Sequence, residues 1–387
     1  MSSGHILKRG STWSIKYDLP SDISGKRRIK TKGGFSTKRA AQEALTKIMG
    51  QQNSGIFVDL NKTTVSGFLS QWLSTYAEPN LSSTTSERYR LLCQNNIAPY
   101  IGHMQLAKLQ PLQIEDLYAQ LRRNRKSDGK RRLSEQTILH VHRCLHKALQ
   151  KAVDWQLLVR NPAHSVQSPK PQKAQILAID SLQTAELFCR FEDTRGYCAV
   201  LVLSTTGVRR GELLALRWRQ VDLAHESMSV ISTVKQTTAK GIEIERPKTK
   251  NSVRKITLPE LTVNSLRKHK AIQAEEKLKA GSAYRDSNFV FATELGAIWS
   301  PQAFSQYFRN IIKKSPEFKG VTPHVLRHSH ATQLLIEGVH PKVVSERLGH
   351  ANISITLDIY SHILPGLQEE AAEKINASLL NAMQNLR

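Results

Sequence analysis

The chain has 387 residues, enough for two or three domains, and its 56 Lys and Arg residues exceed its 32 Asp and Glu residues by 24. Such a surplus costs self-repulsion unless a polyanion accompanies the fold, so nucleic acid is the expected partner. The sequence shows no lipidation signal, no apolar run that spans a bilayer and no signal peptide, which excludes a membrane partner and predicts a cytoplasmic, nucleoid-associated protein.

Residues 1–60 form a small basic segment. Apolar and polar side chains alternate over Trp13–Leu19, which predicts a half-buried strand. Lys26–Lys32 follows as a second, nearly all-cationic strand, and Ser36 and Thr37 then offer caps for a helix that runs through Met49. Such a unit can lay a cationic sheet face into a DNA groove, although a solvated basic face is the alternative. The candidate DNA contacts are Lys16, Lys26, Arg27, Arg28, Lys30 and Lys32.

Residues 63–168 are predicted to be entirely helical. Apolar side chains over Val65–Tyr76 recur at the spacing of an amphipathic helix. Further helices are expected at Thr84–Asn96, Pro111–Asn124 and Glu135–Leu158, with Ser134 as an N-cap. Basic residues crowd the connection before Ser134, which is either a solvated loop or a phosphate contact. The candidates there are Arg122, Arg123, Arg131 and Arg132.

Four neighbouring side chains in this segment are of types that commonly bind metal ions: His140, His142, Cys144 and His146. Their i,i+4 pairs point to different faces of one helix, so we expect an ordinary helix and assign no metal site. The four cysteines of the chain include no C-x-x-C pair, which argues against a disulfide scaffold and fits a reducing compartment.

Prolines at 162, 169 and 171 mark a linker before the last segment, residues 174–387. There we expect helices together with a small three-stranded antiparallel sheet between Ser227 and Leu258. The predicted fold class is therefore multidomain α+β: a small sheet with one helix, an all-helical domain, and a mainly helical domain with a small sheet.

The stretch TGVRRGELLALRW holds the first candidate for chemistry. Gly207 permits a tight bend into a helix, and Arg209 and Glu212 then share one helix face. The carboxylate can orient the guanidinium so that its planar fork meets a phosphate, whereas the simpler alternative is a structural ion pair. Further along, Lys248 lies just before a predicted turn at a hairpin tip, where most lysines are merely solvated.

The stretch TPHVLRHSHATQLLIEG predicts a helix capped by Thr322, with His324 and Arg327 as i,i+3 neighbours in its first turn. Free N–H groups and the positive dipole end at a helix start favour an anion. A short helix then stops at Gly349 and leaves His350 on a loop. Tyr360 follows ten residues later; taken alone, such a tyrosine is more often a core residue than a catalyst.

Taken together, these residues resemble the tyrosine recombinase, or phage integrase, family. Six positions match its catalytic set in order: Arg209, Lys248, His324, Arg327, His350 and the nucleophile Tyr360. The first segment resembles the arm-type DNA-binding domain of integrative elements, and the helical segment resembles the core-binding domain. The resemblance thus divides the chain into an arm-type domain (1–60), a core-binding domain (63–168) and a catalytic domain (174–387).

The resemblance implies a site-specific recombinase that cuts and rejoins double-stranded DNA through a 3′-phosphotyrosyl link, with no cofactor. Arg209, Arg327 and His350 would stabilise the phosphate, Lys248 would be the general acid, and Glu212 would orient Arg209. His324 would either accept the phenolic proton or hold the phosphate. The resemblance further implies that the chain binds core-type and arm-type DNA sites. A directionality factor and a host DNA-bending protein are its other implied partners.

The tail from Leu367 to Arg387 carries an apolar stripe at helical spacing. It either packs on its own domain or, as the family resemblance suggests, on a neighbouring protomer of a tetramer on DNA. Three other functions remain open: a Xer-type resolvase, a non-enzymatic DNA-binding regulator and a type IB topoisomerase. The basic first segment favours the integrase of a mobile element, and the intact six-residue set favours an enzyme.

Overall fold

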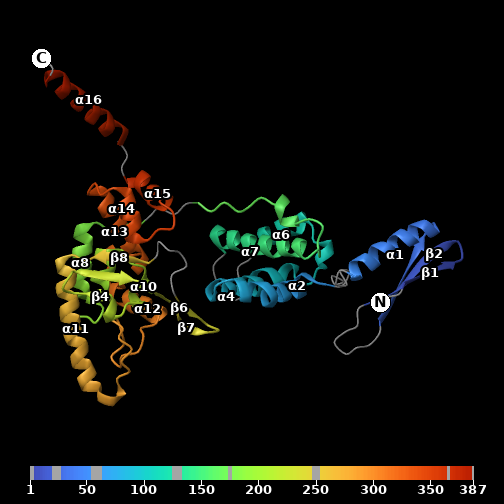
Figure 1. Ribbon diagram of the computed structural model, residues 1–387, viewed down its shortest axis with the longest axis horizontal. Helices are drawn as coiled ribbons and strands as arrows, with labels where there is room; N and C mark the ends of the chain where they lie inside the picture. The colour runs from blue at the N-terminus through green and yellow to red at the C-terminus, as the bar shows by residue number, and fades with distance from the viewer. Residues whose placement is uncertain are drawn as a thin grey trace. The chain divides into compact units, whose positions relative to one another are not determined.

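The computed structural model of the chain describes residues 4–19, 28–53, 63–123, 133–172, 177–245, 253–363 and 367–385. It divides into two compact units, Met1–Lys173 and Ala174–Arg387 (Figure 1). The fold is mainly helical with small antiparallel sheets, which confirms the predicted fold class.

The N-terminal part of the first unit is a three-stranded antiparallel sheet in the order β1-β2-β3 with one helix packed on it. Its elements are β1 (Gly4–Arg9), β2 (Thr12–Leu19), β3 (Arg28–Phe35) and α1 (Lys38–Asn53). Ile15 and Tyr17 of β2 pack with Ala41 and Leu45 of α1, and Lys16 between them is exposed, as the predicted alternation requires. The alternation is interrupted at Ser14, which is also buried. The strand β1 was not predicted.

The rest of the first unit is helical. Its elements are α2 (Val65–Trp72), η1 (Leu73–Ala77), α3 (Glu78–Asn80), α4 (Ser83–Leu92), η2 (Cys93–Ile97), α5 (Ala98–Ile101), η3 (Leu106–Lys108), α6 (Pro111–Arg123), α7 (Glu135–Asp154) and η4 (Pro162–Ser165). The buried faces of α2, α6 and α7 form one core around Phe68 and Trp72. The predicted cap is confirmed, because the Ser134 hydroxyl accepts a hydrogen bond from the Thr137 N–H.

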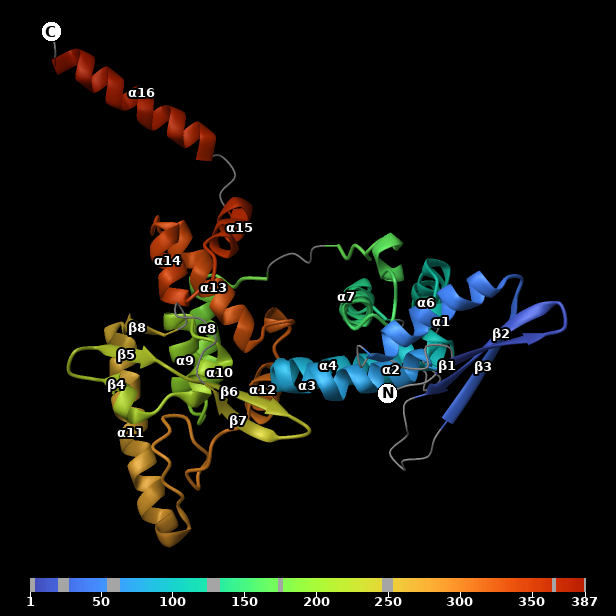
Figure 2. The same ribbon diagram turned by 45° about the vertical axis from the view of Figure 1, so that its right-hand side comes forward.

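The second unit combines helices with two small sheets, and Figure 2 shows the β6–β7 hairpin (residues 233–245) extending outward from the helices. The helices are α8 (Ser181–Phe191), α9 (Tyr197–Thr206), α10 (Arg210–Ala215), η5 (Trp218–Gln220), α11 (Glu260–Ala280), η7 (Gly281–Ala283), α12 (Pro301–Ile312), η8 (Pro316–Phe318), α13 (Pro323–Ile336), α14 (Pro341–Leu348), α15 (Ser354–Ile363) and α16 (Leu367–Asn385). Helix α9 is buried nearly all round and forms the centre of the core.

The strands of this unit differ from the single sheet that the sequence predicted. A three-stranded sheet has the order β4-β5-β8, made of Val221–Asp222, Ser227–Val230 and Arg254–Thr257. A separate hairpin pairs β6 (Thr233–Thr237) with β7 (Gly241–Glu245). The strands β7 and β8, which precede and follow Lys248 in the chain, belong to different sheets, and the predicted hairpin tip that holds Lys248 lies outside the described residues.

Candidate active site

The first side of the site is the turn between α9 and α10. Gly207 ends α9 with a left-handed φ of 66°, which turns the chain so that Arg209 stands at the N-cap of α10. Arg209 Nη1 donates to Glu212 Oε1 at 2.7 Å, and Nη2 donates to the carbonyl of Gly349 at 3.1 Å. The predicted pair on one helix face is therefore present, and it is anchored to the end of α14.

Glu212 lies beneath this arginine, with only 3% of its side chain exposed. Burial alone would raise its pKa, but the hydrogen bond and charge of Arg254, followed by those of Arg209, lower the pKa of Glu212 overall. Arg254 Nη2 donates to Glu212 Oε2 at 2.9 Å, and its Nε donates to the carbonyl of Arg347 at 2.7 Å. The carboxylate thus holds two guanidinium groups in place.

Arg327 supplies the second guanidinium of the site from the buried side of α13. Its Nη1 and Nη2 donate to the carbonyls of Gly207 and Leu348 at 2.7 and 2.8 Å. Burial, and then the charge of Arg209, lower the pKa of Arg327 to about 9. A guanidinium has five N–H donors, so these two contacts leave others for an anion, and an anion would relieve the repulsion between the two arginines.

The two histidines of the site are both held in the neutral form. Burial and the neighbouring His328, Arg327 and Arg209 lower the pKa of His324, whose ring lies edge-on to that of His328 with centroids 4.6 Å apart. Burial, Arg327 and Arg209 lower the pKa of His350 to about 4. The Nδ1 of His350 shares a hydrogen bond of 2.8 Å with the Thr356 hydroxyl, which fixes the ring orientation.

Helix α15 carries Tyr360 close behind this loop. It contacts both α13 and α14, and its Ile359 is buried against Leu335 and Leu348; the three helices stand together in Figure 1. The backbone of Tyr360 belongs to α15, while its side chain lies outside the described residues. Lys248 lies outside them as well.

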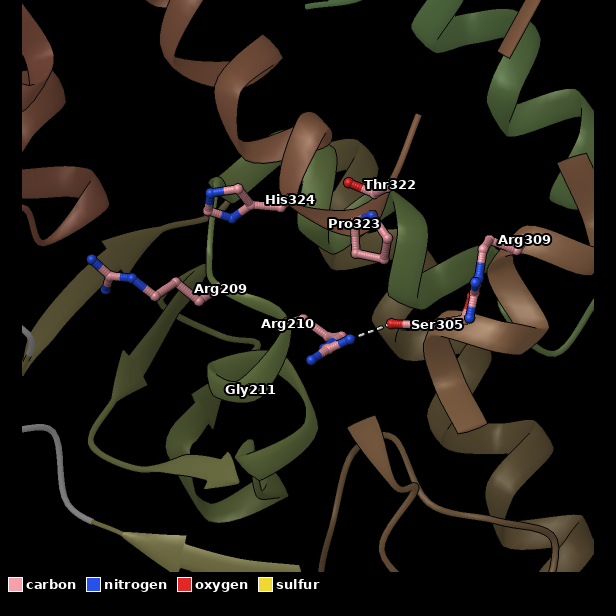
Figure 3. A pocket seen from close by; sticks show the side chains of 8 residues that line it. All are labelled: Arg209, Arg210, Gly211, Ser305, Arg309, Thr322, Pro323 and His324. Carbon is pink, nitrogen blue, oxygen red and sulfur yellow. Dashed lines mark hydrogen bonds between the residues drawn. The ribbon is translucent and has the colours of Figure 1, made fainter. Parts of the chain in front are cut away.

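A cavity of about 470 Å³ opens beside Arg209 and His324. Figure 3 shows Arg209 and His324 on one side of it and Arg210, Ser305 and Arg309 on the other. Thr322 and Pro323 at the start of α13 also line it. As predicted, the Thr322 hydroxyl caps α13 by accepting from the Val325 N–H, and Pro323 takes the first helical position. The walls combine cationic side chains with a helix N-terminus, an arrangement suited to an anion.

The predicted DNA-contact residues lie apart from this cavity along the chain. In the small N-terminal sheet, Lys16 and Lys32 are exposed, with Lys16 on the face of β2 opposite the buried Ile15 and Tyr17. Arg28 and Lys30 belong to β3, but their side chains, like Lys26 and Arg27, lie outside the described residues.

The second group of predicted DNA contacts flanks α7. Arg123 is exposed, whereas Arg122 is paired with Glu135 through two contacts of 2.7 and 3.1 Å. That pairing neutralises part of the charge on which the DNA prediction for Arg122 depends. Arg131 and Arg132 are outside the described residues.

The side chains considered as metal ligands have other partners. His142 Nδ1 bonds the Tyr118 hydroxyl at 2.9 Å, the sulfur of Cys144 lies 3.8 Å from that of Cys93, and His140 bonds Gln136. In the part of the chain that the structure describes, no group of three or more metal-binding side chains occurs. Within the same residues, no helix is both long and apolar enough to cross a membrane.

Sequence reasoning missed two residues that shape the site, Arg254 and Thr356. A signal for Arg254 was available, because Ile256 of the same strand is a core residue and period-2 alternation turns Arg254 to the same face. Thr356 is fully buried in the first turn of α15 and fixes His350, but nothing in its sequence setting distinguishes it.

Comparison with known proteins connects this geometry to a family. Residues 176–366 match the "Phage integrase family", residues 5–52 an "Arm DNA-binding domain" and residues 64–122 a "Phage integrase, N-terminal SAM-like domain". The chain is 30% identical over 361 residues to "Tyrosine recombinase XerC-like" of Caldanaerobacter subterraneus subsp. tengcongensis, covering 88% of this chain and 90% of that protein. The chain belongs to the tyrosine recombinase family of phage integrases.

Solved structures agree with this family at the level of fold. The Tn1549 transposon integrase in complex with transposon right-end DNA superposes with a TM-score of 0.67 at 22% identity, covering 82% of this chain and all of that one. A λ integrase tetramer bound to a Holliday junction gives 0.55 at 16% identity, covering 90% and 95%. The family resemblance read from the motifs is confirmed, and this tyrosine recombinase is an enzyme of DNA recombination.

Proposed function

We propose that this recombinase is the integrase of a mobile element, and that it cuts and rejoins double-stranded DNA through a 3′-phosphotyrosyl link to Tyr360. The observation that carries the proposal is the convergence of Arg209, Arg327, His324 and His350 beside the helix that bears Tyr360. Separate elements of the chain build one anion site, which a purely structural role of these residues would not require.

In the proposed reaction, the Tyr360 oxygen attacks the scissile phosphorus as the bond to the 5′ oxygen breaks. Negative charge gathers on the non-bridging oxygens in the transition state, where Arg209 and Arg327 can donate their remaining N–H groups. Both guanidinium groups are already fixed by backbone carbonyls, so little reorganisation accompanies the reaction. The phosphotyrosyl bond conserves the phosphodiester energy for rejoining, which requires no nucleotide cofactor.

Two protons move in this step. The phenolic proton leaves Tyr360, and the neutral His324 can accept it; alternatively His324 holds the phosphate while another base acts. The 5′ oxygen takes a proton from Lys248, the general acid by family resemblance. His350 is neutral and donates a hydrogen bond to the phosphate, and Glu212 positions Arg209 rather than touching DNA.

The other domains supply the grip on DNA. We infer an arm-type domain over 1–60, a core-binding domain over 63–168 and a catalytic domain over 174–387, a division supported by the separate family matches. The exposed Lys16 and Lys32 on the small sheet suit phosphate contacts at arm-type sites. A directionality factor, a host DNA-bending protein and action at the nucleoid in the cytoplasm belong to the same proposal.

The tail supports assembly into a tetramer. Apolar side chains on α16 are exposed, with Ile375, Leu379 and Met383 each at least 60% accessible. Residues spaced by four share a helix face, so these form a stripe that a partner surface can cover. We infer that α16 docks on a neighbouring protomer, in an assembly of the kind seen for the λ integrase tetramer.

A Xer-type resolvase is the second candidate, because the similarity to a XerC-like protein extends over 88% of this chain. The match of residues 5–52 to an arm DNA-binding domain favours an integrase, since Xer-type enzymes normally lack that segment. The intact set of site residues weighs against a non-enzymatic regulator in the same way.

A nicked duplex carrying the target site tests the proposal. The wild-type chain should form a covalent adduct with this DNA that survives SDS, and Tyr360→Phe should form none. An adduct that persists in Tyr360→Phe would contradict the mechanism. Relaxation of a supercoiled plasmid that lacks any target site would instead support a type IB topoisomerase.

A further inference from the structure

Two arginines of the active-site cavity have no part in the proposed chemistry. Arg210 lies next to Arg209 in the chain, and Figure 3 shows the two side chains diverging, with Arg210 pointing toward Ser305 of α12. On that far side the cavity is lined by Ser305 and Arg309 of α12. The cationic surface of the cavity therefore continues beyond the residues that would hold the scissile phosphate.

Arg210 differs in its partners from the arginines of this domain that pair with glutamates. Arg209 and Arg254 both bind Glu212, and Arg195 binds Glu276. Arg210 donates instead to the neutral hydroxyl of Ser305, and among the described residues it has no carboxylate partner. The residue as a whole is exposed, yet protein atoms around its guanidinium desolvate it and lower the pKa of Arg210.

Arg309 extends the same arrangement by one helical turn. It stands four residues after Ser305 on α12, so both side chains share a helix face. Its Nε donates to the carbonyl of Ser305 at 3.2 Å, and no carboxylate contacts it in the described part of the chain. Two uncompensated guanidinium groups thus meet at Ser305, beside the N-terminus of α13, where the helix dipole adds further positive potential.

We propose that Arg210 and Arg309 bind a second DNA phosphate, the one next to the scissile phosphate on the cleaved strand. This inference rests on the proposed function, which places the scissile phosphate at Arg209. Consecutive Cα atoms are about 3.8 Å apart, so two diverging arginines can reach neighbouring phosphates of one strand. Contacts at two points fix the direction and register of the strand, which aligns the scissile bond with its nucleophile.

The experiment uses the full-length protein and a nicked duplex whose site is first selected from random-sequence DNA by the wild-type chain. Each phosphate near the cleavage point is replaced, one at a time, by an uncharged methylphosphonate. Cleavage rates are compared for wild type, Arg210→Ala, Arg309→Ala and the control Arg267→Ala. The control removes an exposed arginine of α11 that binds Asn264 and the Leu223 carbonyl, outside the cavity.

For wild type and Arg267→Ala, neutralising the neighbouring phosphate should slow cleavage roughly 10- to 100-fold, the range for a lost charged hydrogen bond. Arg210→Ala and Arg309→Ala should cleave unmodified DNA more slowly by a similar factor. Their cleavage rate should fall no further when the phosphate next to the scissile phosphate is neutralised. Equal losses in wild type and variants at every position would overturn the proposal. Arg210→Lys is a second variant for the case in which Arg210→Ala folds poorly. It keeps the positive charge and should therefore retain part of the cleavage rate.

A binding measurement separates this proposal from the proposed function. If the wild-type chain bound the selected duplex but formed no covalent adduct, the proposed function would be contradicted. The phosphate contact could still be tested through the binding affinity. The logarithm of the affinity falls as the logarithm of the salt concentration rises. This negative slope should then become shallower by about 0.9 in the Arg210→Ala/Arg309→Ala double variant, because one phosphate contact is lost. An unchanged slope would overturn the second phosphate site.

Discussion

Glu212 is the residue on which the geometry of the arginines depends most. It is buried and bound by Arg209 and Arg254, so removal of its charge leaves Arg254 without its carboxylate in a nearly buried position. We predict that Glu212→Gln slows DNA cleavage roughly 10- to 100-fold while DNA affinity falls much less, because the arginines remain but lose their alignment.

Single-turnover cleavage and binding titrations check this prediction. Glu317→Gln is the matched control, since Glu317 forms an exposed pair with Arg190 at 3.5 Å and such pairs contribute little. Equal rates for Glu212→Gln and Glu317→Gln would show that the buried carboxylate does not position the arginines.

The neutrality of His350 gives a prediction for pH. Its pKa of about 4 in the free protein lies below the value of about 6.5 for an exposed imidazole. Between these values the unfolded chain binds more protons, so the contribution of His350 to stability is complete above pH ~6.5 and is lost as the pH falls toward 4. NMR of the ring nitrogens should show a midpoint near 4, and binding of target DNA to Tyr360→Phe should raise it, since phosphate offsets the nearby arginines. A midpoint of 6.5 in the free protein contradicts the described packing.

At the scale of elements, the turn between α9 and α10 sets the position of Arg209. Gly207 has a φ of 66°, and a Cβ there would lie 2.5 Å from Leu348 Cδ2 and 2.7 Å from His330 Cδ2. We predict that Gly207→Ala lowers the free energy of unfolding by about 2–5 kcal/mol, the sum of left-handed strain and overpacking, and abolishes cleavage.

Gly241 is a control for the strain alone. It has a φ of 69° at the start of β7, and a Cβ added there would meet no atom within 4 Å, so Gly241→Ala should cost only about 1–2 kcal/mol. Urea unfolding of both variants measures the difference. If the two variants lost the same stability, the close packing of Gly207 on Leu348 and His330 would be refuted.

The elements also show where sequence reasoning works. The cap at Thr322, the proline at 323 and the left-handed Gly349 are local signals, and they located both α13 and the loop of His350. Strand pairing is not local: β6 and β7 pair with each other, although the sequence between Ser227 and Leu258 suggested one sheet. The strand β1 was missed because only Ile6 and Gly4 of Gly4–Arg9 are partly buried, which leaves little alternation to detect.

The site was predictable to the extent that its residues lie in short motifs. Arg209, His324, Arg327 and His350 were identified from their order and are brought together by the fold. Arg254 shares a strand face with the core residue Ile256, but its contact with Glu212 joins residues distant in sequence and is visible only in three dimensions. Thr356 lies in no distinctive motif, so its contact with His350 could not be predicted either.

For the whole molecule, assembly on DNA is the property that α16 should control. Contact of its exposed apolar stripe with water is unfavourable unless a partner covers these side chains. We predict that truncation after Leu364 impairs formation of the tetramer on paired sites more than it impairs binding of one protomer to a single site. Native gel shifts with one-site and two-site duplexes measure both steps, and an equal loss of both would instead favour docking of α16 on its own domain.

The central claim, that Tyr360 is the nucleophile, is tested most directly by locating the covalent bond. The wild-type adduct is trapped on a nicked duplex, digested with nuclease and trypsin, and analysed by mass spectrometry. Cleavage after Arg347 and Lys374 gives a peptide whose sole tyrosine is Tyr360. We predict a nucleotide attached through its 3′ phosphate to this tyrosine, and a nucleotide on any other residue would contradict the claim.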